Sequence, residues 1–389
     1  MDTYSTNTPR VRKGTLKGVK IISFFLVAAG LLSFQNVQLI SSALSNSFEW
    51  NYEIMNQISD DKPDPSLIPL EELAAKNPNI TCPEGLFPIE NTHLPLSVTH
   101  SNRLIPKVVH VTSKQRCATK AVIDNINKWR FENHSLYFHD DDAVERLIQH
   151  PITRQEFPEL REIFKCATSG ATKSDLWRYV VLYLYGGIYS DIDNSPIKFN
   201  GETIKSEDDS FFVIEQLGIM SQYFLASSVG HPLMRQMLET GLYNLKQTGN
   251  VMVNNAATTT GPKAVKVGFI KFMAEVGVET DGYIPAGIYV GQNNRSVTVI
   301  GEAGRSKDYV HRGGLGNKNK GEYYNAVGIK HFLSMRQGQG PNPISCKEHL
   351  KRTNGTDDKV ANYIYVPELG HYIDGYNQTA LKLYNLTRR

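Results

Sequence analysis

The chain has 389 residues, of which 40% are hydrophobic, and this is enough apolar material for one large or two modest globular domains. The formal net charge is +3, but five of the 42 basic residues and a single acid fall within the first twenty positions. The rest of the chain holds 37 basic and 38 acidic residues. A nearly neutral body without a basic stripe excludes nucleic acid as a partner.

The N-terminal basic cluster is followed by an apolar segment, residues 18–40, whose most hydrophobic part runs from Ile21 to Phe34. A membrane span needs about 20 mostly apolar residues, and flanking positive charge stays in the cytosol. We therefore predict a cytosolic tail over residues 1–17 and a transmembrane signal-anchor over 18–40, with the remainder in the secretory lumen. A cleavable signal peptide is the alternative, because the small residues near Ser42 could form a cleavage site.

Six Asn-x-Ser/Thr sequons support a secretory location, because such triplets accept glycans in the lumen. They begin at Asn79, Asn133, Asn294, Asn354, Asn377 and Asn385. The sequence therefore predicts a glycoprotein.

The four cysteines, Cys82, Cys117, Cys166 and Cys346, lack the close paired spacing of a zinc site. In an oxidising lumen they could form up to two disulfides in any of three connectivities. The alternative is that some of them are buried thiols.

Residues 41–100 are polar and rich in proline, without sustained apolar periodicity, and we predict a luminal stem there. A folded domain is predicted over residues 101–389. It opens with a valine-rich run at 105–112 that is typical of a buried strand. The apolar residues of 118–129 then follow at helical spacing, as expected for an amphipathic helix.

The same alternation continues along the chain. A second strand is predicted at 135–138, and the acidic residues that follow it suit the start of a helix over 140–148. Further strands are predicted at 211–215 and 223–227, and a helix at 231–245. Strands that alternate with helices indicate an α/β domain whose sheet has parallel character.

The most informative segment is SGATKSDLWRYVVLYLYGGIYSDIDNSP, residues 169–196. Thr172 can cap a helix with an apolar face, and Gly186–Gly187 supplies the left-handed stop of that helix. A strand follows directly. Because side chains alternate along a strand, Asp191 and Asp193 are predicted to point the same way.

Two carboxylates side by side repel each other unless a cation lies between them, and Mg²⁺ or Mn²⁺ prefers such oxygen ligands. The ion keeps positions open for phosphate oxygens and neutralises the charge of a leaving diphosphate. We predict that Asp191 and Asp193 are catalytic residues that hold Mn²⁺ or Mg²⁺. The alternative is an aspartyl-phosphate phosphohydrolase, since DIDNS approaches the Asp-x-Asp-x-Thr/Val pattern whose first Asp is a nucleophile.

The run Ser174–Pro196 resembles the signature of glycosyltransferase family 32, with its small residue, Asp, Arg-Tyr, Leu-Tyr, Gly-Gly-x-Tyr and Asp-x-Asp. Shorter similarities extend the resemblance over about residues 104–335: IPKVVHVTSK (105–114), GHPLM (230–234) and TTGP (259–262). The family includes fungal initiation-specific α-1,6-mannosyltransferases and inositol-phosphoceramide mannosyltransferases. The resemblance implies a Rossmann-like GT-A catalytic domain over residues 101–389, a nucleotide-sugar donor, a Golgi location and retention of the anomeric configuration.

The resemblance also implies roles for individual residues. Asp191 and Asp193 correspond to the family's Asp-x-Asp pair, with Asp193 as the direct metal ligand. Asp175 and Arg178, which share a helical face, correspond to donor-sugar contacts. The structural alternative is that Thr172 and Asp175 form a capping-box-like pair and that Arg178 only neutralises Asp175.

Two histidines are further candidates. The resemblance implies that His331 is a late ligand of the metal or the diphosphate, although Met335 replaces the tryptophan that the family places after this histidine. His110, at the end of the first predicted strand, would lie near the nucleotide, because α/β sheets bind ligands at the carboxyl ends of strands. The alternative for each is a histidine that packs in the core.

The sequence thus predicts a single-pass type II Golgi membrane protein. Its luminal domain would move a hexose, mannose from GDP-mannose, to a glycan or glycolipid acceptor by a retaining, front-face mechanism. Two alternatives stay open. One is a related enzyme that uses a UDP-hexose or UDP-N-acetylhexosamine donor, and the other is a catalytically silent homologue that binds sugar.

Overall fold

The computed structural model describes the chain from residue 67 onward, with gaps. Side chains are described for residues 67–99, 103–167, 169–215, 218–247, 256–302, 308–329, 346–347 and 349–350, and the backbone alone for two short strands at 363–366 and 371–374. The predicted tail, the transmembrane segment and His331 lie outside these residues. Among the helices that are described, none has both the length and the apolar character that crossing a bilayer requires.

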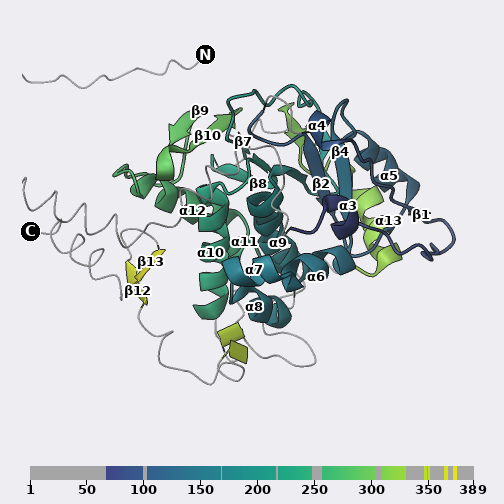
Figure 1. Ribbon diagram of the computed structural model, residues 1–389, viewed down its shortest axis with the longest axis horizontal. Helices are drawn as coiled ribbons and strands as arrows, with labels where there is room; N and C mark the ends of the chain where they lie inside the picture. Colours follow the sequence, from purple (N-terminus) through teal and green to yellow (C-terminus); the bar gives the residue numbers. More distant parts are fainter. Residues whose placement is uncertain are drawn as a thin grey trace, which may run out of the picture. The chain divides into compact units, whose positions relative to one another are not determined.

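A seven-stranded mixed sheet forms the centre of the fold (Figure 1). Its order is β4 (Ser135–His139), β2 (Val108–Thr112), β5 (Gly187–Ser190), β8 (Met220–Ser227), β7 (Ser210–Ile214), β10 (Ser296–Ile300) and β9 (Gly287–Val290). β2 runs parallel to β4 and β5, and β10 runs parallel to β7, whereas β8 is antiparallel to both of its neighbours. The α/β prediction is confirmed. The sheet is mixed because a short connection turns the chain directly from β7 back into β8.

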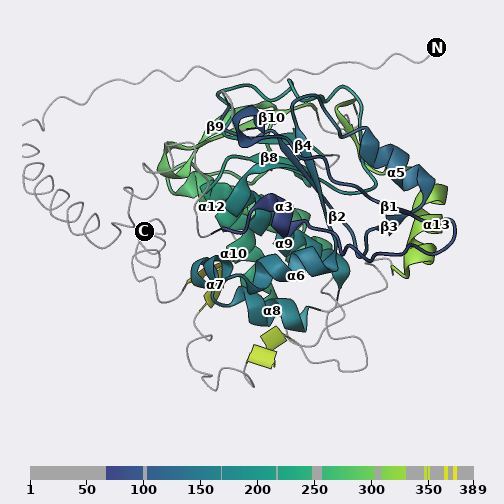
Figure 2. The same ribbon diagram turned by 45° about the vertical axis from the view of Figure 1, so that its right-hand side comes forward.

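Helices cover both faces of this sheet (Figure 2). Two hydrophobic cores lie between the helices and the sheet. On one face, α9 (Gly170–Tyr185), α10 (Pro232–Gln247) and α12 (Pro262–Ala274) pack against one another and against β7, β8 and β10. On the other face, α5 (Lys120–Asn127) and α13 (Asn317–Val327) cover β2, β5 and β8. Strand residues alternate between the cores, so that Phe212 belongs to the first and Phe211 to the second.

The remaining elements are short. The helices are α3 (Leu70–Leu73), α4 (Leu96–Thr99), α6 (Asp141–Gln149), α7 (Pro151–Glu156), α8 (Leu160–Cys166), α11 (Ala256–Thr259) and the 3₁₀ turn η1 (Gln292–Asn294). The paired short strands are β1 (Phe87–Pro88) with β3 (Cys117–Ala118), β6 (Ser195–Pro196) with β11 (Val310–His311), and β12 (Tyr363–Val366) with β13 (His371–Asp374).

Most of the predicted elements are present. The strands expected at 105–112, 135–138, 211–215 and 223–227 are β2, β4, β7 and β8, and the helices expected at 118–129, 140–148 and 231–245 are α5, α6 and α10. The predicted cap of α9 is wrong, because the helix begins at Gly170 and its N-cap is Ser169, which makes no side-chain cap bond. Thr172 instead lies buried inside the first turn.

Gly186 and Gly187 end α9 and turn the chain straight into β5, as predicted. Their φ angles are +63° and +101°, a region that side chains other than glycine rarely adopt. A Cβ atom on Gly187 would lie 2.7 Å from the carbonyl oxygen of Val108, so β2 could not come as close as it does. The two glycines therefore allow β5 to approach β2 closely enough to pair with it.

The predicted stem differs from the structure, because residues 67–99 pack onto the sheet unit. Leu73, Ala74 and Ile89 in this segment are buried. A disulfide joins Cys82 to Cys117, and a second one joins Cys166 to Cys346, so all four cysteines are paired. A few buried apolar side chains, polar contacts and a disulfide attach the segment, and they lack the regular spacing of an amphipathic helix or strand.

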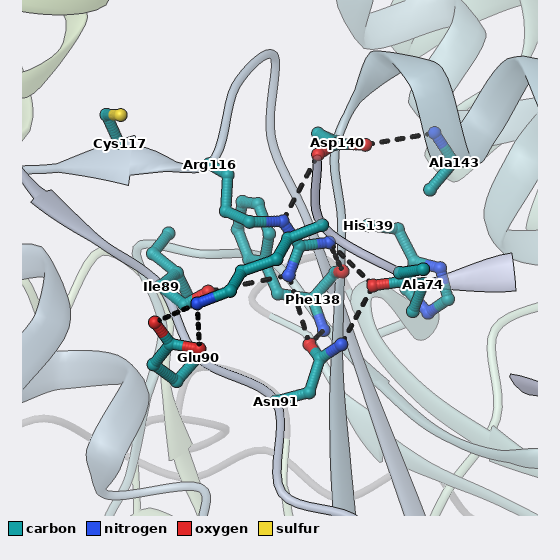
Figure 3. Close-up of polar contacts among 12 residues, drawn as sticks. Ala74, Ile89, Glu90, Asn91, Arg116, Cys117, Phe138, His139, Asp140 and Ala143 are labelled. Carbon is teal, nitrogen blue, oxygen red and sulfur yellow. Dashed lines mark hydrogen bonds and ion pairs between the residues drawn. The ribbon is translucent and has the colours of Figure 1, made fainter. Parts of the chain in front are cut away.

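The polar contacts centre on Arg116, which is 1% exposed (Figure 3). Its guanidinium donates to oxygen atoms on both sides of the junction between segment 67–99 and the sheet: Ala74 O at 2.8 Å, Phe138 O at 2.7 Å, Asn91 Oδ1 at 3.3 Å, Ile89 O at 3.4 Å and Asp140 Oδ2 at 3.2 Å. Asp140 also caps α6 by accepting from the amide of Ala143. One side chain thus satisfies several buried carbonyl groups.

Replacing Arg116 with methionine is expected to lower the free energy of unfolding by about 2–3 kcal/mol, because buried acceptors lose their donor. Urea unfolding of the oxidised protein measures the change. Lys76→Met is the matched control, since Lys76 pairs with Glu90 at 2.6 Å on the surface of the same segment. This control should shift the free energy by less than about 0.5 kcal/mol. Equal losses in the two variants would contradict the role of Arg116.

Candidate active site

The Asp-x-Asp segment lies in a turn that follows β5. The strand ends at Ser190, and the amide of Asn194 donates to the carbonyl oxygen of Asp191 at 3.1 Å. The prediction that the strand continues through Asp191 and Asp193, so that both point the same way by strand alternation, is therefore wrong. The Asn194 side chain fastens this turn to β8, because it donates to the carbonyl oxygen of Tyr223 at 2.8 Å.

Helix α5 fixes this turn from the other side. The Asn125 side chain donates to the carbonyl oxygens of Ile192, at 3.1 Å, and of Asn194, at 2.7 Å. The indole N–H of Trp129 also donates to Asn194, at 3.1 Å. The backbone that carries both aspartates is thus held by buried hydrogen bonds, which favours a preorganised site.

Asp191 lies between Arg178 and Tyr189. Its Oδ1 accepts from the Tyr189 hydroxyl at 2.8 Å and pairs with the Arg178 guanidinium at 3.2 Å, and 29% of its side chain is exposed. Poor hydration raises the pKa of Asp191, Arg178 opposes that rise, and the charge of Asp193 adds to it. The two carboxylates are thus close enough to influence each other.

Arg178 connects Asp191 to Asp175. The guanidinium is buried, pairs with Asp175 at 3.1 Å, donates to the carbonyl oxygen of Gln222 at 2.7 Å and lies 4.4 Å from the centre of the Tyr189 ring. Burial disfavours its charge, but Asp191, Tyr189 and Asp175 outweigh that effect and raise the pKa of Arg178. The guanidinium is therefore a fixed positive charge beside the turn.

Asp175 is only 4% exposed, and both of its oxygens accept from protein groups. Oδ2 accepts from the Thr260 hydroxyl at 2.8 Å, and Oδ1 accepts from the Gln222 side chain. Burial raises the pKa of Asp175 to about 6, although Arg178 and these hydrogen bonds oppose the rise. The capping-box alternative is wrong, because the partner is Thr260 and not Thr172. The sugar contact of Asp175 stays a prediction, and the structure shows it as the group that orients Arg178.

Asp193 is paired with a lysine that sequence reasoning did not find. Its Oδ2 lies 2.5 Å from the Nζ atom of Lys320 on α13, and its carbonyl oxygen accepts from the amide of Leu315 at 3.0 Å. Arg312, just before α13, has a side chain that is 63% exposed and adds a second cation that acts on Asp191. In the sequence these residues belong to the run HRGGLGNKNK, residues 311–320. Nothing in that run indicates that it lies beside the Asp-x-Asp turn.

The two carboxylates could hold a divalent cation. Among the described residues, no donor reaches Oδ2 of Asp191 or Oδ1 of Asp193, so each side chain keeps one oxygen for a ligand. The part of the chain that the structure describes brings no third His, Cys, Asp or Glu into a group with them. Mg²⁺ and Mn²⁺ are commonly bound by one or two carboxylates together with substrate phosphates, so this donor set fits such an ion.

His110 is fully buried within β2. One ring nitrogen lies 3.1 Å from His139, the other lies 3.0 Å from the carbonyl oxygen of Gly186, and burial lowers the pKa of His110 to about 4. The structure therefore gives this histidine a packing role between β2 and the end of α9. Its nucleotide contact stays a prediction, as does the ligand role of His331, which lies outside the described residues.

Residues 112–211 match the family described as "Glycosyltransferase sugar-binding region containing DXD motif". Over these residues the chain is similar to that glycosyltransferase family. The region includes Asp175, Arg178 and both aspartates of the turn, and the predicted resemblance to a DXD-containing glycosyltransferase family is confirmed.

Two known proteins are similar to parts of this chain. The chain is 26% identical over 155 residues to the initiation-specific alpha-1,6-mannosyltransferase of Schizosaccharomyces pombe, which corresponds to 34% of this chain and 39% of that relative. This chain therefore spans about two fifths of the length of the relative that it matches. A solved structure, the PaToxG glycosyltransferase, aligns with a TM-score of 0.31 and 16% identity over 46% of this chain and 76% of its own.

Proposed function

We propose that this protein is a metal-dependent, retaining glycosyltransferase with a GT-A fold. It moves a hexose from a nucleotide-sugar, with GDP-mannose as the first candidate, to a glycan or glycolipid acceptor. The observation that carries the proposal is the pair Asp191 and Asp193 in a fixed turn, each with one carboxylate oxygen that no described residue engages. The mannose donor is suggested by the name of the yeast relative.

Each protein group at the site has a distinct task in this proposal. Asp191 and Asp193 would hold Mn²⁺ or Mg²⁺, which supplies positive charge to the diphosphate as the anomeric bond breaks. Asp175 keeps Arg178 in place, and Arg178 keeps Asp191 in the orientation that leaves Oδ2 open. Lys320 and Arg312 add positive charge on the side of α13. The bound cation and these basic side chains together favour departure of an anion.

The phosphohydrolase alternative receives no support from the contacts of Asp191. Its Oδ1 is held by Arg178 and Tyr189. A front-face displacement assisted by the diphosphate is the proposed chemistry. NMR of the product anomer tests it, and an inverted anomer would contradict retention.

The setting of the enzyme is also a proposal. Residues 1–17 form the cytosolic tail, residues 18–40 anchor the chain in the Golgi membrane, and the domain that follows lies in the lumen. The stem is shorter than residues 41–100, because residues 67–99 pack onto the sheet unit.

The donor assay tests the function directly. Full-length protein in detergent is incubated with Mn²⁺ and, in separate reactions, GDP-mannose, UDP-galactose or UDP-N-acetylglucosamine, and the release of nucleoside diphosphate is measured. We expect release of GDP from GDP-mannose with Mn²⁺, and none when EDTA is added. If only UDP is released, the donor is a UDP-sugar and not GDP-mannose. Release from no donor, with or without a glycan acceptor, would support the silent homologue.

A further inference from the structure

Helix α13 places a lysine directly on the proposed metal-binding pair. The Nζ atom of Lys320 lies 2.5 Å from Oδ2 of Asp193, and it also lies over the ring of Tyr324, 5.3 Å from the ring centre. The side chain of Lys320 is 29% exposed, while that of Asp193 is 10% exposed. A partly exposed ammonium side chain thus pairs with a nearly buried carboxylate.

Two of the cations at the site, Arg178 and Lys320, are held in different ways. Arg178 is buried and contacts Asp175, Asp191 and the carbonyl oxygen of Gln222. Among the described residues, Lys320 has Asp193 as its only carboxylate partner within ion-pair distance. A lysine ammonium on a flexible stem can change partners, whereas a planar guanidinium with several fixed bonds cannot. Of the two, Lys320 is therefore the cation that can leave.

A divalent cation on Asp193 and an ammonium 2.5 Å from the same carboxylate would repel each other. A nucleoside diphosphate resolves this conflict, because its phosphate oxygens offer the ammonium group another anionic partner. The same oxygens complete the coordination of a cation that takes only two carboxylates from the protein.

We propose that Lys320 is an exchangeable counter-ion that couples the binding of the divalent cation to the binding of the diphosphate. In the donor-free protein Lys320 holds Asp193 and keeps the affinity for the cation low. When the diphosphate binds, the ammonium moves to a phosphate oxygen and Asp193 becomes available to the cation. This inference rests on the proposed function, because it takes Asp191 and Asp193 as the cation site.

Mn²⁺ binding tests the proposal without any turnover. Free Mn²⁺ is measured by electron paramagnetic resonance in solutions of the full-length protein in detergent, with and without GDP. The variant is Lys320→Met. The matched control is Lys318→Met, since Lys318 lies on the same helix, is 88% exposed and is 4.0 Å from Glu322. Lys320→Gln is a second variant in case the methionine variant does not fold.

Without GDP, the Lys320→Met protein is expected to bind Mn²⁺ about tenfold more tightly than the wild type, since it lacks the competing ammonium. GDP should tighten Mn²⁺ binding by about tenfold or more in the wild type and by less than about threefold in Lys320→Met. By reciprocity, Mn²⁺ should tighten GDP binding by about tenfold or more in the wild type and in Lys318→Met, and by less than about threefold in Lys320→Met.

Three outcomes are distinguishable. If wild type and Lys320→Met bind Mn²⁺ with equal affinity without GDP, the counter-ion proposal is overturned and the proposed function stands. If no protein binds Mn²⁺ even with GDP, both are overturned. If the expected shifts occur but no donor is hydrolysed, the counter-ion proposal holds and the proposed transferase activity fails.

Discussion

Replacing Asp193 with asparagine is expected to lower the rate of donor hydrolysis by about 10³-fold, because one anionic ligand of the diphosphate-binding cation is lost. Asparagine has nearly the same shape, and the backbone bond from Leu315 to the carbonyl oxygen of residue 193, 3.0 Å long, does not depend on the side chain. The turn and the start of α13 should therefore persist, so the loss reports chemistry and not unfolding.

Release of nucleoside diphosphate from the best donor, together with a thermal melt, measures this effect. Asp124→Asn is the control, since Asp124 is an exposed aspartate of α5 that pairs with Lys120 at 2.9 Å. Its rate should equal that of the wild type. An Asp193→Asn protein that keeps its melting temperature and at least half of the wild-type rate would refute a catalytic role for this carboxylate.

Replacing Arg178 with methionine is expected to reduce the free energy of unfolding by about 3–5 kcal/mol, because it leaves two carboxylates without their shared partner in a poorly hydrated place. Asp175 is nearly fully buried and Asp191 is largely so. Activity should fall as well, since Asp191 loses the group that orients it. Lys at position 178 should recover only part of the stability, because an ammonium cannot span both carboxylates in the way a guanidinium does.

Urea unfolding of the folded domain checks the loss of stability. The control is Lys165→Met, which breaks an ion pair of the same i, i+3 spacing, between Lys165 and Glu162, in an exposed position. This exposed pair should contribute less than about 0.5 kcal/mol. If removal of Arg178 cost no more than removal of Lys165, the buried network would not stabilise the fold.

The fold was largely predictable from local patterns. The valine-rich run of β2 and the helical spacing of α5 and α10 indicated those elements, and the paired glycines indicated the turn from α9 into β5. The elements after residue 256 were not predicted; α12 is the longest helix among them and β10 is the longest strand that lies in the central sheet. Their sequences combine short apolar runs with polar segments, and only their position against the first core decides which run becomes helix and which becomes strand.

Residues 67–99 show a second limit of pattern reasoning. The segment is polar and rich in proline, which is typical of a stem, yet Arg116 and the disulfide from Cys82 to Cys117 attach it to the sheet. No periodicity signals such an attachment, because single hydrogen bonds to backbone carbonyls can come from any part of the chain.

The candidate site was found in part. The aspartates and Arg178 lie within a span of 19 residues, and their proximity followed from one helix and one strand that adjoin each other. Thr260 and Lys320 were missed as partners. Thr260 is 85 residues from Asp175, and Lys320 is 127 residues from Asp193.

The sequence by itself determined an α/β domain and two aspartates after a strand with an arginine one helix earlier, and it predicted a secretory location. Only the tertiary structure decided which charges pair, which cysteines join, and that the aspartates lie in a turn and not along the strand. The physical reason is that periodicity and turn residues act over a few neighbouring positions, whereas ion pairs and disulfides depend on distances that exist only once the sheet and its two helical layers have formed.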